Sequence, residues 1–199
     1  DNAWGDPHER QVHVYLPPSY SERRKDPYAV VFLLAGWSGR GAHYLADGGA
    51  FSHTMPERLD QLIETKQMPP VIVVMPDATS RLGASQYVNS PIIGAHMDYL
   101  CEELVVGVDQ RFHTHRSRYF RGVVGHSSGG FGALALGMMR SDRFGALCSS
   151  AGDCWYEHLY THTIPLTITT VARAGGVGPF VDRYLANPNP RFLLGEAAT

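Results

Sequence analysis

The sequence has few cysteines and no apolar run long enough to cross a membrane. Its three cysteines, Cys101, Cys148 and Cys154, are an odd number without metal-ligand spacing, which favours reduced thiols and leaves a Cys148–Cys154 disulfide as the alternative. The longest apolar run lies near Ala29–Ala35, far short of the roughly 20 residues that a membrane helix needs. The first residues do not read as a signal peptide, so we expect a cytoplasmic protein, or a secreted one whose signal peptide has been removed.

The sequence also lacks a large excess of one charge sign, internal repeats and low-complexity tracts. The 17 Lys and Arg residues nearly balance the 19 Asp and Glu residues, and the formal net charge is −2. Composition therefore gives no support to binding of nucleic acid or of an anionic membrane surface. With 44% hydrophobic and 18% charged residues, the chain has the composition of a soluble globular protein, and its length suits one domain.

Apolar runs alternate with helical patterns over about the first 150 residues. The expected strands are Arg10–Leu16, Tyr28–Ala35, Val71–Met75, Tyr119–Val124 and Phe144–Ser150, and the expected helices are Met55–Lys66, Ile93–Phe112 and Ser128–Met139. The second and third strands are unbroken apolar runs, which suits strands buried on both faces. Such strands alternating with helices predict an α/β fold, a mostly parallel sheet with helices on both faces.

The pattern weakens after Ala151. Pro165–Ala174 fits either a helix or a strand, and Gly175–Pro190 is rich in Gly, Pro and Asn, which predicts irregular structure. We interpret residues from about 152 to 199 as a cap or excursion over the functional site, within a single domain that spans 1–199. A flexible tail is the alternative.

The segment Gly125-His126-Ser127-Ser128-Gly129 lies between an expected strand and an expected helix. G-x-S-x-G in this context is typical of a nucleophile elbow, in which a serine occupies a tight strand-to-helix turn. We expect Gly125 and Gly129 at positions where a Cβ would collide across the turn. A chain with 21 glycines can contain the bare pattern by chance, so the flanking strand and helix support the prediction more than the motif does.

Ser127 is the candidate nucleophile, and attack on an ester needs a base, an acid that orients the base, and donors for the oxyanion. One donor is expected to be the backbone N–H of Ser128, directly after the nucleophile. The other is expected to be the N–H of Trp37, with Gly36 allowing close approach. Both loops follow parallel strands, whose carboxyl ends form one edge of a sheet. The alternative for Trp37 is an aromatic residue that only packs.

The acid, the base and the substrate pocket are less visible. In this type of site the triad runs in the chain order serine, acid, histidine, and after Ser127 we find neither a late strand ending in aspartate nor a following histidine loop. Asp153 is a weak candidate for the acid. Tyr87 and Trp155, together with Gly36, are candidates for substrate contacts, although aromatic residues near a cleft often only pack. We therefore hypothesise that the chain is incomplete at its C-terminus and lacks the last strands.

Four segments in order resemble the putative esterase family, which includes esterase D (S-formylglutathione hydrolase), feruloyl and enterochelin esterases, and the mycolyltransferases. The segments are Val14–Tyr20 (VYLPPSY), Val31–Gly36 (VFLLAG), Val73–Asp77 (VVMPD) and Gly125–Gly130 (GHSSGG). The resemblance covers about residues 6–160.

This resemblance implies an α/β-hydrolase fold, a serine–histidine–acid triad, no cofactor, and a possible homodimer. Separately, no spacing of His, Asp and Glu residues in the sequence suggests a metal site. The resemblance places Ser127 at the nucleophile and Trp37 and Ser128 at the oxyanion positions. Two residues depart from the family pattern. Ala35 stands where the family usually has histidine, and Ser128 where methionine is common. Neither change removes a backbone donor.

The leading functional prediction is a serine carboxylic ester hydrolase that acts on a small-molecule ester through an acyl-enzyme on Ser127. An acyltransferase of the mycolyltransferase type is the first alternative, because the same apparatus can pass the acyl group to an alcohol when water is excluded. The second alternative is an inactive hydrolase-like domain used for binding.

Overall fold

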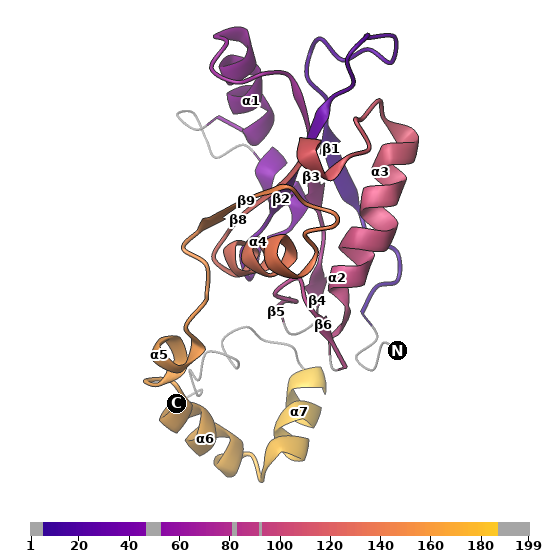
Figure 1. The fold of residues 1–199 in the computed structure, drawn as a ribbon. Coiled ribbons are helices and arrows are strands. Elements are labelled where there is room, and N and C mark those ends of the chain that lie inside the picture. The colour runs from indigo at the N-terminus through magenta and orange to yellow at the C-terminus, as the bar shows by residue number, and fades with distance from the viewer. Residues whose placement is uncertain (1–5, 47–52, 81–82, 92, 187–199) are drawn as a thin grey trace. The chain divides into compact units, whose positions relative to one another are not determined.

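A mixed sheet organises the first part of the chain (Figure 1). The computed structural model describes residues 6–46, 53–80, 83–91 and 93–186. It contains two compact units, Asp1–Gly152 and Asp153–Thr199, which are treated separately below. The prediction that the whole chain forms one domain stays a prediction.

The main sheet of unit 1 has the strand order β1-β3-β2-β8-β9 in the described residues. Its strands are β1 (Val12–Tyr15), β2 (Ala29–Leu34), β3 (Val71–Pro76), β8 (Arg121–His126) and β9 (Ala146–Ser150). β1 runs antiparallel to β3, and the other neighbouring pairs are parallel, which confirms the expected mostly parallel sheet. Leu34 of β2 is paired with Gly125 of β8, so the carboxyl ends of these two strands lie side by side.

Burial differs among the strands. β3 is buried along its whole length, as its apolar run predicts. The prediction of two buried faces is wrong for β2, where buried and half-buried residues alternate. One face of β2 packs in the larger core, whereas Ala29, Val31 and Leu33 on the other face are only partly covered by a smaller cluster around Leu59. An unbroken apolar run therefore does not show how completely each face is covered.

Helices pack on both faces of the sheet. The larger core contains residues of α2 (His96–Asp98), a π-helical turn (Tyr99–Leu104), α3 (Val105–Arg111) and α4 (Ser128–Met139). The smaller cluster on the other face contains residues of α1 (Met55–Glu64) and of the 3-10 helix η1 (Gly41–Leu45). α1 begins at a capping box, in which Thr54 and Glu57 each accept a hydrogen bond from the other's backbone N–H. Reciprocal capping of this kind satisfies the free N–H groups of the first turn.

Several boundaries differ from the sequence prediction by one to three residues, for example β1, which begins at Val12, and β9, which begins at Ala146, and two of the differences have a visible cause. The helix expected from Ile93 begins at His96, because Gly94–Ala95 forms β7 and pairs with β6 (Asn89–Ser90). The strand expected from Tyr119 begins at Arg121, because residues Arg118–Phe120 form the 3-10 helix η3. The expected polar loop 78–91 also contains a second short hairpin, β4 (Thr79–Ser80) and β5 (Gly83–Ala84). Hydrogen bonds between short neighbouring segments decide these ends.

Unit 2 is helical in its described part, with α5 (Tyr156–Tyr160), α6 (Ile164–Arg173) and α7 (Val177–Ala186). Pro165–Ala174 is therefore helical up to Arg173. The expectation of irregular structure after Gly175 is wrong over α7. Gly175 and Gly176, at φ 93° and 110°, form the turn between α6 and α7, a conformation that glycine adopts without strain. Residues 187–190 of the same expectation lie outside the described residues, and the cap role of this unit stays a prediction.

Among the described residues, no helix combines the length and the apolarity needed to span a bilayer.

The burial of the three cysteine thiols predicts the order in which they react with an alkylating reagent. All three are free thiols, with Cys101 buried and Cys148 and Cys154 exposed, so the disulfide alternative does not hold in this structure. Burial raises the pKa of the Cys101 thiol to about 11, and the thiolate is the reactive form. We expect iodoacetamide to label Cys148 and Cys154 in the native protein and Cys101 only in denaturant, as read by peptide mass spectrometry. Labelling of native Cys101 at a similar rate would contradict its burial.

Candidate active site

Ser127 lies at the junction between β8 and α4 and has an unusual backbone. Its φ and ψ are 55° and −122°, a conformation that costs energy for a residue with a Cβ and that tends to occur at functional sites. The turn is held by two backbone hydrogen bonds. The N–H of Ser127 donates to the carbonyl of Ser150 at 2.9 Å, and the N–H of Phe131 donates to the carbonyl of Ser127 at 2.9 Å. The backbone therefore has the strained strand-to-helix turn that the predicted nucleophile elbow requires.

The glycines around Ser127 allow the backbone to approach closely. A Cβ on Gly125 would overlap the backbone of Gly129, and a Cβ on Gly129 would lie 2.7 Å from the carbonyl oxygen of Ala35. These contacts confirm the steric role predicted for both glycines. Gly130, which the sequence analysis did not single out, is similar, since its Cβ would lie 2.7 Å from the carbonyl oxygen of Ser150. The signal was present in the doubled glycine after Ser128.

The loop after β2 lies directly beside Ser127. A Cβ on Gly36 would be 3.5 Å from the Cβ of Ser127. The N–H of Gly39 donates to the carbonyl of Gly36 at 3.0 Å, which closes a tight turn around Trp37. The Trp37 side chain is 37% exposed, and its indole lies against Gly83, where a Cβ would be 2.9 Å from Cζ2. The structure thus brings Gly36, Trp37 and Ser127 together, and donation to an oxyanion stays a prediction.

Ser128 is the first residue of α4 and is 1% exposed. At a helix N-terminus the helix dipole adds partial positive charge. The start of α4 next to Ser127 therefore favours developing negative charge. The donor role predicted for the N–H of Ser128 stays a prediction.

Tyr87 lies in the core. It is 3% exposed, its hydroxyl donates to the carbonyl of Ala35 at 2.9 Å, and a Cβ on Gly132 would be 2.6 Å from its ring. Burial raises the pKa of the Tyr87 hydroxyl, so it stays a proton donor. The structure gives Tyr87 packing and hydrogen-bonding contacts, and the predicted contact with a substrate stays a prediction.

Three histidines of unit 1 contact groups other than the Ser127 hydroxyl. His126 is exposed, with Nδ1 3.5 Å from the hydroxyl oxygen of Ser150. His96 is buried and its Nε2 is 2.8 Å from the carbonyl oxygen of Ile93; burial lowers the pKa of this ring. His113 contacts the carbonyl of Arg24 at 2.9 Å. In the part of the chain that the structure describes, no histidine is hydrogen-bonded to the Ser127 hydroxyl.

Two predicted site residues, Asp153 and Trp155, belong to unit 2. Trp155 is 67% exposed and stacks on His158, with ring centroids 4.9 Å apart. Unit 2 is described by itself, so the acid role of Asp153 and the substrate contact of Trp155 stay predictions.

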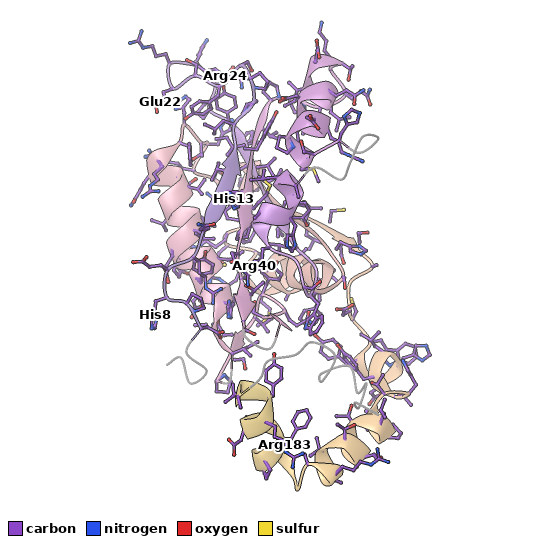
Figure 2. All side chains as sticks on the ribbon, turned by 180° about the vertical axis from the view of Figure 1, so that it is seen from behind. His8, His13, Glu22, Arg24, Arg40 and Arg183 are labelled. Atoms are coloured by element: carbon purple, nitrogen blue, oxygen red, sulfur yellow. The ribbon has the colours of Figure 1, made fainter. Side chains whose placement is uncertain are left out.

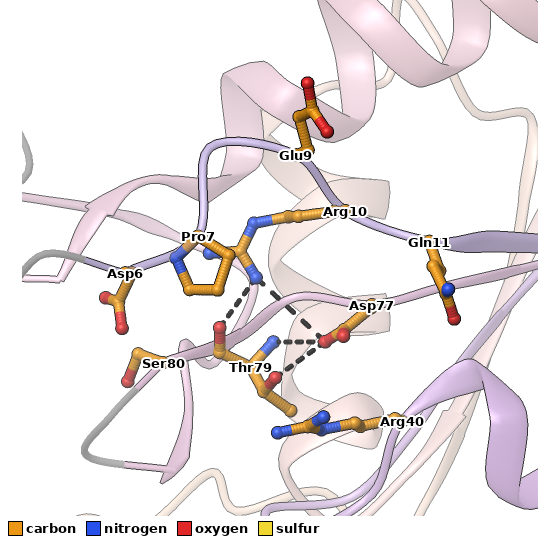
Figure 3. A pocket seen from close by; sticks show the side chains of 9 residues that line it. All are labelled: Asp6, Pro7, Glu9, Arg10, Gln11, Arg40, Asp77, Thr79 and Ser80. Carbon is orange, nitrogen blue, oxygen red and sulfur yellow. Dashed lines mark hydrogen bonds and ion pairs between the residues drawn. The ribbon is translucent and has the colours of Figure 1, made fainter.

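A polar cavity of about 540 Å³ opens close to the loop after β2 (Figure 3). Its lining residues are Asp6, Pro7, Glu9, Arg10, Gln11, Arg40, Asp77, Thr79 and Ser80. Arg10 donates to the carbonyl of Thr79 at 2.6 Å and lies 4.0 Å from the Asp77 carboxylate, which also accepts the Thr79 hydroxyl at 2.6 Å. Arg40 and His8 lie far from Glu22 and Arg24, which stand at the opposite end of unit 1 (Figure 2). The sequence analysis did not anticipate this cavity.

The fold and the elbow define a protein of the α/β-hydrolase class. The chain shares this fold with a ferulic acid esterase at 24% identity and a TM-score of 0.59, over 68% of this chain and 51% of that one. It shares it also with the S-formylglutathione hydrolase FrmB of Staphylococcus aureus at 22% identity and a TM-score of 0.57, over 78% and 59% of the two chains.

The family model described as Putative esterase matches residues 7–175, and the chain belongs to this family. The chain is also 21% identical over 160 residues to the uncharacterized protein YbbA of Bacillus subtilis (strain 168). The matched region covers 75% of this chain and 59% of that protein. It spans between half and three fifths of the length of these relatives. The resemblance seen in the four sequence segments is thereby confirmed.

Proposed function

We propose that this chain carries the nucleophile and the oxyanion site of a serine carboxylic ester hydrolase that acts on small-molecule esters. The observation that supports this most is the strained backbone of Ser127, at φ 55° between β8 and α4, with Gly36 so close that a Cβ there would lie 3.5 Å from the Cβ of Ser127. Strain of this kind persists only where the surrounding structure holds it. At a strand-to-helix turn it exposes a serine hydroxyl to a substrate.

In the proposed reaction the Ser127 hydroxyl oxygen attacks the ester carbonyl carbon. The hydroxyl proton passes to a histidine base, and the carbonyl oxygen becomes an oxyanion that accepts hydrogen bonds from the N–H groups of Trp37 and Ser128. Collapse of this intermediate breaks the bond to the alcohol oxygen, and the alcohol leaves with the proton. The acyl-enzyme on Ser127 then reacts with water, which releases the acid and restores the serine.

The base and its acid are the open part of the proposal. Asp153 is the proposed acid and His158 and His162 are candidates for the base, all from unit 2. The homodimer implied by the family also stays a prediction.

A fluorophosphonate probe tests the nucleophile. We expect the probe to add one phosphonyl group to Ser127, located by peptide mass spectrometry, and we expect Ser127→Ala to lose the label. Ser150→Ala is the matched control, because Ser150 is an exposed serine whose carbonyl, which the substitution keeps, accepts the Ser127 N–H, and the substitution removes only a hydroxyl 3.5 Å from His126 Nδ1. Failure to label the wild type, or equal labelling of Ser127→Ala, would overturn the proposal and favour a binding role.

Product analysis separates hydrolysis from acyl transfer. With p-nitrophenyl acetate and added glycerol we expect acetate as the product, because the loop and elbow residues around Ser127 include exposed groups that water can reach. Formation of glyceryl acetate as the main product would show transfer to an alcohol instead.

A further inference from the structure

Two tyrosine hydroxyls hold consecutive carbonyl groups at the end of β2. Tyr44, from η1, donates to the carbonyl of Leu34 at 3.1 Å. Tyr87, from the segment between β5 and β6, donates to the carbonyl of Ala35 at 2.9 Å. The next residues are Gly36 and Trp37, the start of the proposed oxyanion loop. Two segments distant in sequence therefore fix the peptide groups from which this loop departs.

The same carbonyl groups contact the first turn of α4. A Cβ on Gly129 would overlap the carbonyl oxygen of Leu34 and lie 2.7 Å from that of Ala35. One turn further along α4, the ring of Tyr87 packs against Gly132, where a Cβ would be 2.6 Å from Cδ2. The ring of Tyr87 thus contacts α4, and its hydroxyl contacts the carbonyl of Ala35, directly after β2.

Tyr87 also has a rarely adopted backbone conformation. Gln86 and Tyr87 are consecutive residues with φ of 55° and 58°, which L residues with large side chains seldom adopt. The N–H of Tyr87 donates to the hydroxyl oxygen of Ser85 at 3.2 Å, and Ser85 is fully buried. Packing on all sides keeps Tyr87 in this conformation. The strained backbone delivers the hydroxyl to Ala35.

We propose that Tyr87 is a positioning residue for the oxyanion loop. Its hydroxyl fixes the peptide between Ala35 and Gly36, and this peptide sets the direction of the following N–H groups relative to Ser127. Tyr44 supports the preceding peptide in the same way. The inference rests on the proposed function, because donors contribute most to catalysis when they are held in place before the oxyanion forms.

Tyr87→Phe tests the role, since it keeps the ring against Gly132 and removes only the hydroxyl. Tyr28→Phe is the matched control. Tyr28 directly precedes β2, at the end opposite to Ala35. It is 1% exposed, and its hydroxyl donates to the carbonyl of Ser19 at 2.9 Å. We expect Tyr87→Phe to lower kcat for p-nitrophenyl acetate and the rate of fluorophosphonate labelling by about 10–100-fold, as for a small misplacement of catalytic groups. KM should stay near the wild-type value, and Tyr28→Phe should behave as the wild type.

Three results would overturn the proposal. They are wild-type kinetics in Tyr87→Phe, an equal loss of kcat in Tyr28→Phe, and a raised KM with unchanged kcat, the last being the result of a direct substrate contact. If the wild type itself fails to react with the probe, the proposed function fails separately. Hydrogen–deuterium exchange of residues 35–39 then decides, since faster exchange in Tyr87→Phe than in Tyr28→Phe supports positioning and equal exchange contradicts it.

Discussion

Gly125→Ala is expected to destabilise the protein by at least about 3 kcal/mol, at the upper end of what overpacking usually costs. A methyl group at this position would overlap the carbonyl carbon and oxygen of Gly129 and lie 2.9 Å from its Cα. All three are backbone atoms of the elbow helix, which cannot move aside as a flexible side chain could. Either β8 or α4 must shift, and Ser127 lies between them. Urea unfolding measures the loss, and fluorophosphonate labelling of the folded fraction reports on the site.

Gly107→Ala is the control for this variant. Gly107 lies inside α3, and a Cβ there would meet nothing within 4 Å. Alanine is favoured over glycine in a helix interior, so this variant should gain about 0.5–1 kcal/mol. If Gly125→Ala were as stable as the wild type, the close packing of strand and helix at the elbow would be wrong.

The second large effect is expected at the ion pair between β8 and α3. The Arg121 guanidinium lies 2.5 Å from the Asp109 carboxylate, and the exposed fractions of the two side chains are 6% and 18%. Asp109 also accepts the Thr114 hydroxyl at 2.7 Å. Asp109→Ala leaves the buried Arg121 guanidinium without its carboxylate, although its Nη1 still donates to the carbonyl of Arg143 at 2.9 Å, so the variant should cost about 3 kcal/mol. Thermal and urea unfolding measure this loss.

An exposed pair and a double variant make this prediction specific. Asp142 lies 3.1 Å from Arg140 with 59% of its side chain exposed, and Asp142→Ala should cost about 1 kcal/mol or less, as is usual for surface pairs. The double variant Asp109→Leu/Arg121→Met replaces both charges with apolar groups and should regain most of the lost stability. A double variant as unstable as Asp109→Ala would mean that lost packing, and not the unpaired charge, causes the effect.

Much of the fold was predictable because the signals are local. The helix Ser128–Met139 matches α4 at both ends, since a glycine-rich turn precedes it and a run of small and apolar residues follows. The strand Val71–Met75 matches β3 to within one residue. The prediction for Ile93–Phe112 missed its start, because the β6–β7 pairing that ends at Ala95 is a contact between two segments and leaves no periodic signal in either.

Some residues of the candidate site were likewise predictable from local sequence, and others were not. Gly125, Ser127 and Gly129 were predictable, because a sharp turn places steric demands on residues that are adjacent in the chain. Tyr87 lies in the core, and its predicted contact with a substrate stays a prediction. Its position depends on two consecutive residues with positive φ, and the residue types Gln86 and Tyr87 give no sign of that conformation.

The sequence by itself determined the class of fold, the sharp turn at Ser127 and the family, because periodicity and turn sterics act over a few neighbouring residues. Only the tertiary structure decided that Gly36 packs against Ser127, that Tyr44 and Tyr87 hold the end of β2, and that Arg121 pairs with Asp109. Gly36 and Ser127 are far apart in the chain, and the parallel register of β2 and β8 brings their two loops to one edge of the sheet. No local pattern records that register. Tyr44 and Leu34, and Asp109 and Arg121, are 10 and 12 residues apart, and periodicity does not specify which of these side chains and carbonyl groups meet.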